Sequence, residues 1–239
     1  MRDVGEHDGG STPPPLFRTT LADGATLAWR DTGGDGPVVV LCHPHTGRSE
    51  SFAGRSRFLA GKGYRAIAPD RRSYGVSAGP TTGGTQGGDL ATVLEAAGAT
   101  GPAALIGVAA GTVAAVDFAL GAPHRVRRLM LCGSLMAVTD PDWQARLAQV
   151  QEPLLAGRSL AEKELSIRFR RDRPAGVRLW ERIASENAAS GAGEPPQATG
   201  QTASFADLRS VPFPLLLATG TDDLYLPPGL MNRALRRLP

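Results

Sequence analysis

Short apolar runs separated by helix-length segments are the feature that most constrains how this chain can fold. PVVVLC is apolar on both faces, as strands buried inside a parallel sheet are, and YRAIAPD, AALIGV, VRRLMLCGS and FPLLLATG are predicted as further strands. Helical patterns over 51–63, 86–98 and 112–122 alternate with them, after a hairpin that turns at Asp23-Gly24. This order predicts an α/β fold with a doubly wound, mostly parallel sheet and right-handed crossovers.

Breaks in this alternation divide the chain into regions. Residues 1–15 are rich in Gly, Pro and charge without periodicity, and we expect them to form a disordered leader. Polar helical segments and a Gly/Pro/Gln/Thr-rich stretch fill 137–209, which we interpret as an inserted helical cap. The α/β core is therefore expected over 16–136 and 210–239.

Composition argues against several classes of protein. The longest apolar runs are strand-sized and far short of the roughly 20 residues that a membrane-spanning helix needs. The net charge of +3 comes almost wholly from Arg, and we infer no nucleic-acid binding from it. Cys42 and Cys132 lie in apolar runs, as buried reduced thiols do. We expect a cytoplasmic protein without a metal or cofactor, and with neither nucleic acid nor membrane as a partner.

The turn after AALIGV carries the strongest chemical signal. Gly107-Val108-Ala109-Ala110-Gly111 leads from a buried strand through a sharp turn into a helix of small residues. Small residues on both sides of the turn allow the backbone and the helix to approach closely. This is the setting of a nucleophile elbow, which presents a nucleophilic side chain at the carboxyl edge of the sheet.

Four segments in order resemble the cap-bearing α/β-hydrolase family of esterases, lactonases, epoxide hydrolases and carbon–carbon bond hydrolases. They are VVVLCHPHTG, YRAIAPDRRSYGVS, the elbow with ALGAPHRVRRLMLCGS, and LLLATGTDD. Ser73 stands where the family's Asp-x-Arg-Gly-x-Gly-x-Ser turn has its first glycine. The resemblance implies a pocket for a small, largely apolar ester, lactone or related carbonyl compound.

The resemblance also assigns roles to individual residues. Ala109 falls on the nucleophile, Asp223 on the acid, and the backbone N–H groups of His45 and Ala110 on the oxyanion hole. An alanine methyl group cannot attack a carbonyl, so the chain as written is expected to be catalytically impaired. Ala109 is either a natural or an engineered replacement. Pro44, beside the donor, is expected to stiffen the loop.

No histidine falls where the family places its catalytic base. That base follows one more strand after the Asp223 turn, whereas this sequence stops at Pro239. His43 matches a structural position and is a pocket candidate, while His45 is a backbone donor or an alternative acid or base. Without a further strand FPLLLATG becomes a bare sheet edge, which predicts either a truncated chain or a partner over that edge, for example a second copy.

Three functional hypotheses stay open. The first is an impaired hydrolase relative whose partner is a small apolar carbonyl compound. The second is a non-catalytic pseudo-hydrolase that binds a ligand or a protein, and the third is a lyase, cyclase or isomerase that polarises a carbonyl with the oxyanion hole. Trp143 and Trp180 in the predicted cap would line an apolar pocket, although burial against the core predicts the same residues.

Overall fold

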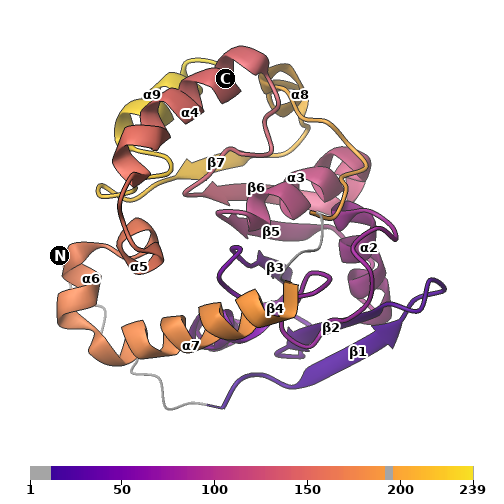
Figure 1. Ribbon diagram of the computed structural model, residues 1–239. Coiled ribbons are helices and arrows are strands. Elements are labelled where there is room, and N and C mark those ends of the chain that lie inside the picture. Colours follow the sequence, from indigo (N-terminus) through magenta and orange to yellow (C-terminus); the bar gives the residue numbers. More distant parts are fainter. Residues whose placement is uncertain (1–11, 192–195, 239) are drawn as a thin grey trace.

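One sheet forms the centre of the computed structural model, which describes residues 12–191 and 196–238 (Figure 1). Within these ranges seven strands lie in the spatial order β1-β2-β4-β3-β5-β6-β7, and β3 to β7 run parallel, as the sequence predicts. The strands are β1 (Leu16–Thr20), β2 (Thr26–Asp31), β3 (Val38–Cys42), β4 (Arg65–Pro69), β5 (Ala103–Val108), β6 (Val126–Cys132) and β7 (Leu215–Ala218).

The first two strands form the expected hairpin. Leu16 lies opposite Arg30 and Thr20 lies opposite Thr26, so the antiparallel ladder is continuous. Gly24 in the turn takes a φ of 81°, which side chains other than glycine rarely allow. Because β2 also pairs antiparallel with β4, the sheet is mixed, with an antiparallel edge on a parallel body.

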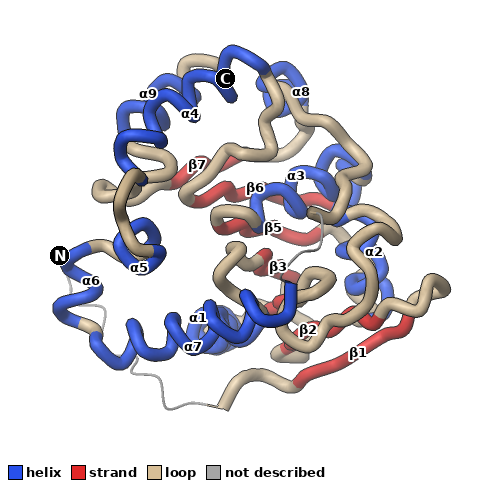
Figure 2. The backbone as a smooth tube through the Cα atoms, in the orientation of Figure 1, coloured by secondary structure: helices blue, strands red, loops and turns tan. Residues whose placement is uncertain are grey.

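Helices cover both faces of the sheet (Figure 2). Outside the segment between β6 and β7, the described helices are η1 (Ser49–Phe52), α1 (Ala53–Ala60), α2 (Gln86–Ala96), α3 (Gly111–Gly121), η2 (Pro123–Arg125) and α9 (Pro228–Leu235). Val40 and Leu105 point to the large core that α2 and α3 cover, whereas their neighbours Val39 and Ile106 join a smaller cluster with Phe52 on the other face. Strands buried on both faces need apolar residues at successive positions, which explains the continuous apolar runs.

Between β6 and β7 the described part of the chain forms five helices. They are α4 (Pro141–Leu155), α5 (Leu160–Glu164), α6 (Ile167–Asp172), α7 (Pro174–Gly191) and α8 (Phe205–Ser210). Figure 1 shows α5 on the side to which the arrowheads of β6 and β7 point, which is the carboxyl edge of the sheet. None of the described helices has the length and apolar character needed to cross a membrane.

Local capping divides this helical segment more finely than its sequence pattern suggests. The stretch LAEKELSIRFRR forms two short helices, because the Ser166 hydroxyl accepts a hydrogen bond from the Phe169 N–H and begins a new helix. Helix α8 was not expected. It begins with a capping box in which Ser204 and Asp207 satisfy each other's backbone N–H groups.

The leader expected over residues 1–15 lies mostly outside the described residues, which begin at residue 12. The part that is described packs against the core. Pro14 is buried, and its carbonyl oxygen accepts a hydrogen bond of 2.8 Å from Arg30 Nη1. At the opposite end of the described sheet β7 pairs with β6 alone, and the side chain of Leu216 is 56% exposed.

Candidate active site

A left-handed turn joins β5 to α3. Ala109 takes a φ of 47°, a conformation that costs a residue with a Cβ roughly 1–2 kcal/mol. The turn is fixed from both sides. The Ala109 N–H donates to the Cys132 carbonyl at the end of β6 over 2.9 Å, and the Thr112 hydroxyl donates to the Ala109 carbonyl over 2.7 Å. The methyl group of Ala109 is thus held in the geometry of a strand-turn-helix elbow.

Two glycines allow this turn to sit tightly on the sheet. A Cβ on Gly111 would lie 2.2 Å from the carbonyl oxygen of Cys42, at the end of β3. A Cβ on Gly107 would lie 2.7 Å from the Cα of Thr112. Both separations are shorter than any real contact, so the close packing expected from the sequence requires glycine at both positions.

The loop after β7 brings Asp223 to the same edge. Its Oδ1 accepts hydrogen bonds from the N–H groups of Tyr225 and Leu226 at 2.9 and 2.8 Å, and its Oδ2 accepts one from the Thr219 hydroxyl at 3.1 Å. A Cβ on Gly133, directly after β6, would meet Oδ2 at 3.1 Å. The carboxylate therefore packs against the end of the strand whose last carbonyl also holds Ala109.

The loop after β3 carries both histidines of the predicted site. His43 is fully buried, and its Nε2 accepts the Arg71 N–H at 3.1 Å while its Nδ1 lies 2.7 Å from the Pro44 carbonyl oxygen. An acceptor at Nε2 leaves the proton on Nδ1, so the ring is neutral. Burial, reinforced by the positive charge of Arg71, holds the pKa of His43 well below its ordinary value. His43 therefore joins two loops and is structural.

The ring of His45 is exposed and its Nδ1 contacts the hydroxyl of Tyr74. Burial of part of the ring and the charge of Arg71 lower its pKa. In the described part of the chain the backbone N–H groups of His45 and Ala110 donate no hydrogen bond. They are available donors, and their role as an oxyanion hole stays a prediction.

The turn after β4 is fastened by buried charge. Arg72 Nε and Nη2 donate hydrogen bonds to the two carboxylate oxygens of Asp89 at 2.7 and 2.9 Å, and Nη1 donates to Asp23 Oδ2 at 2.6 Å. A bidentate pair of this kind is geometrically specific. Ser73, at the family's glycine position, takes a left-handed φ of 63°. The substitution therefore keeps the turn at some cost in backbone strain.

Glu164, the last residue of α5, is a site residue that the sequence did not reveal. Its carboxylate accepts hydrogen bonds from the hydroxyl of Thr46, next to His45, and from Trp180. Burial raises the pKa of Glu164. The pKa of Tyr225 is raised by burial and then by the negative charges of Glu164 and Asp223. The sequence gives no clear sign of this role, because Glu164 lies among other polar residues in a helical pattern. Only the fold brings it to the predicted oxyanion loop.

The two tryptophans of the predicted pocket and the remaining candidate reactive residues have different surroundings in the structure. Trp143 is 2% exposed and packs edge-on against Phe205 with ring centroids 5.3 Å apart, so the structure places it in the core. Its partner in the prediction, Trp180, is half-buried beside Glu164. His124 is exposed at the opposite edge of the sheet, before β6. Burial raises the pKa of the Cys42 thiol to about 12, which makes it a poor nucleophile.

A model of the alpha/beta hydrolase fold family matches residues 37–239, most of the chain. The chain belongs to this α/β-hydrolase family. Among curated proteins, a non-heme chloroperoxidase of Streptomyces lividans is 27% identical over 231 residues, covering 87% of this chain and 82% of that protein. An epoxide hydrolase of Caballeronia sordidicola is 35% identical over 99 residues, but the match covers 39% of this chain and 30% of that enzyme.

Solved structures of the family share the fold. A thermophilic esterase from Thermogutta terrifontis superposes with a TM-score of 0.73 at 23% identity, over 94% of this chain and 87% of that one. An enol-lactonase from Burkholderia xenovorans LB400 gives a TM-score of 0.70 at 19% identity, over 92% and 87%. These structures confirm the fold, and the family model confirms membership of the α/β-hydrolase superfamily, whereas the roles of individual site residues stay predictions.

Gly111→Ala is expected to lower the free energy of unfolding by about 2 kcal/mol or more, because the new methyl group would overlap the Cys42 carbonyl. Urea denaturation followed by circular dichroism measures the change. Gly54→Ala is the matched control, since a Cβ there meets nothing within 4 Å and alanine favours the exposed helix α1. Equal stability of the two variants would contradict the close approach at the elbow.

Acid should destabilise the protein through His43. Because its pKa is lower in the folded state than in the unfolded state, the unfolded chain binds more protons below about pH 6.5, and stability falls as pH falls. Between pH 7.5 and 5.5 this group should remove about 1 kcal/mol. Urea denaturation of His43→Gln at both pH values should show a smaller loss than the parent or the exposed control His124→Gln. Equal losses in all three proteins would rule out His43 as the source.

Proposed function

We propose that this α/β-hydrolase relative binds a small carbonyl compound at the elbow without forming a covalent intermediate at Ala109. The observation that carries the proposal is the left-handed turn at Ala109, with a φ of 47°, because the family resemblance places a nucleophile where this methyl group lies. Covalent catalysis needs a nucleophilic atom there and a base beside it. Among the described histidines, His43 is committed to two loops, His124 lies at the far edge, and the exposed ring of His45 contacts the Tyr74 hydroxyl through Nδ1.

Retained parts of the site support binding of a carbonyl. The unpaired N–H groups of Ala110 and His45 would donate hydrogen bonds to a carbonyl oxygen, in the manner of an oxyanion hole. Three hydrogen bonds fix the position of the Asp223 carboxylate, although none of the described histidines is among its partners. The proposal therefore combines a recognition site for an ester, lactone or related carbonyl with impaired hydrolysis.

Hydrolysis of p-nitrophenyl butyrate tests this function. The parent chain should raise its melting temperature when it binds this ester, yet release p-nitrophenol no faster than Gly111→Ala or buffer does. Ala109→Ser is expected to bind equally and to stay within about tenfold of the parent rate, because a serine without a general base is a weak nucleophile. Turnover by the alanine form at the rates usual for enzymes, about 1 s⁻¹ or faster, would refute the impairment.

A second function, non-hydrolytic proton transfer next to a carbonyl, is favoured by Glu164. This half-buried carboxyl group contacts the predicted oxyanion loop through Thr46, and its raised pKa brings it nearer to the value of an effective general base at neutral pH. A carbonyl polarised by the loop donors could lose an α-proton to Glu164, as a lyase or isomerase requires. Such chemistry needs no nucleophile at Ala109.

Exchange of α-protons distinguishes this second function. Ethyl acetoacetate in deuterated buffer would exchange faster with the protein than without it, as measured by proton NMR. Glu164→Gln would then reduce the protein-dependent rate about 100-fold, while Glu181→Gln, an exposed carboxyl group on α7, would leave it unchanged. Exchange no faster than in buffer alone would eliminate the proton-transfer function and leave simple binding.

A further inference from the structure

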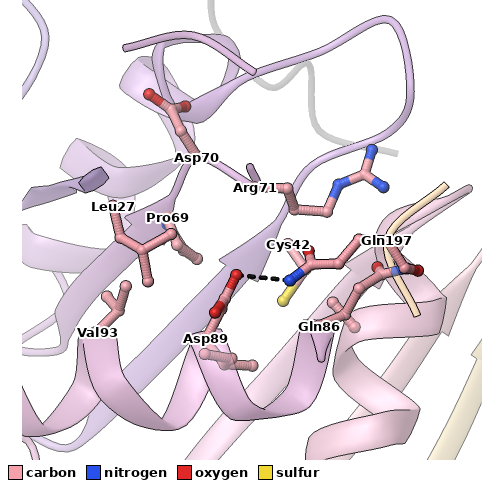
Figure 3. A pocket seen from close by; sticks show the side chains of 11 residues that line it. Leu27, Cys42, Pro69, Asp70, Arg71, Gln86, Asp89, Val93 and Gln197 are labelled. Carbon is pink, nitrogen blue, oxygen red and sulfur yellow. Dashed lines mark hydrogen bonds between the residues drawn. The ribbon is translucent and has the colours of Figure 1, made fainter. Parts of the chain in front are cut away.

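A largely buried guanidinium without a carboxylate partner lies beside the candidate active site. Arg71 directly follows β4 and lines a hollow between the ends of β3 and β4 and the helix α2, together with Gln86, Asp89 and Gln197 (Figure 3). Among the described residues, no group accepts a hydrogen bond from Arg71 Nε or Nη2, and both atoms are buried. An unsatisfied buried charge is costly, so such a group calls for an explanation.

The nearby acids are already committed. Asp89 holds Arg72 through both oxygens and also accepts the Gln197 amide at 2.7 Å. Asp70 accepts the N–H groups of Ser49 and Val76, and Figure 3 shows its side chain diverging from that of Arg71. Neither carboxylate is therefore placed to neutralise Arg71.

The two unpaired atoms are those that this protein uses elsewhere to bind carboxylates. Arg72 holds Asp89 through Nε and Nη2, at 2.7 and 2.9 Å. Arg65 holds Asp31 through the same two atoms, with Nε at 3.0 Å from Oδ1 and Nη2 at 2.5 Å from Oδ2. In Arg71 the same edge of the guanidinium has no hydrogen-bond partner among the described residues, and its geometry matches the two oxygens of a carboxylate.

The surroundings hold this fork in place. The ring of Tyr74 lies 4.3 Å from the guanidinium carbon, an attractive contact for a cation. The hydroxyl of Tyr74 in turn contacts His45 in the predicted oxyanion loop. The charge of Arg71 is close enough to lower the pKa of His43 and of His45. The fork is therefore a neighbour of the elbow site.

We propose that Arg71 binds the carboxylate of an organic ligand through Nε and Nη2. The inference rests on the proposed function in one respect, since it takes this ligand to be the carbonyl compound bound at the elbow. The hollow that Arg71 lines measures about 20 Å³, which is too small for a whole organic ligand, so most of the ligand lies outside it. The ligand class is thus a carbonyl compound with a carboxylate at one end.

Calorimetric binding of two matched esters tests the proposal. Monoethyl succinate carries one carboxylate and diethyl succinate carries none, while both carry an ester. At pH 7.5 and constant chloride, the parent protein should bind the monoester at least tenfold more tightly. Arg71→Met should bring the two affinities within twofold, and Arg71→Lys should lose most of the preference because lysine keeps the charge without the fork. Arg18→Met, on the exposed side of β1, should keep the full preference.

Other results separate this inference from the proposed function. Equal affinity of the parent for both esters would overturn the carboxylate site while supporting carbonyl binding. Binding of butyrate that depends on Arg71, without binding of diethyl succinate, would support the carboxylate site and refute the carbonyl function. Arg71→Met should melt no lower than the parent, since it removes an unpaired charge. A loss of more than about 5 °C would show that the chain itself neutralises Arg71 and would overturn the proposal.

Discussion

The contact between the elbow and the ends of its neighbouring strands is the constraint on which the site depends. Gly111 presses against the carbonyl of Cys42 on one side, and the Ala109 N–H bonds to Cys132 on the other. These contacts fix β3, β5 and β6 relative to one another at their carboxyl ends. His43 follows the first of these carbonyls directly, so its place in the site is a consequence of how closely the elbow packs.

Two consecutive arginines in the turn after β4 have different surroundings, one with carboxylate partners and one without. Arg72 is 2% exposed and saturated by Asp89 and Asp23, and these pairs hold the turn against α2 and the β1–β2 hairpin. Arg71, the residue directly before Arg72, lines the hollow beside this turn. Its Nε and Nη2 atoms have no hydrogen-bond partner among the described residues. A firmly paired residue thus stands next to one whose buried donors are unpaired, an arrangement in which a rigid turn holds a charge in place for a ligand.

Features that depend on neighbouring residues in the chain could be predicted from the sequence, whereas features that depend on the fold could not. The strands, the hairpin and the glycines around Ala109 follow from local pattern and backbone sterics. Trp143 and Trp180 have similar local settings, yet one lies in the core and the other beside Glu164. Glu164 itself was missed, because its contact with Thr46 joins residues far apart in sequence.

The alanine at the elbow has a different meaning once its surroundings are known. A site that has lost its function would not need a left-handed residue with a Cβ, because glycine would adopt the same turn without strain. The turn is nevertheless kept, with unpaired N–H donors at Ala110 and in the loop of His45, and with Asp223 held by three hydrogen bonds. On the proposed function, Ala109 stands at the nucleophile position without an attacking atom, while the geometry of the turn is kept. This combination favours recognition of a carbonyl ligand over simple decay of a hydrolase.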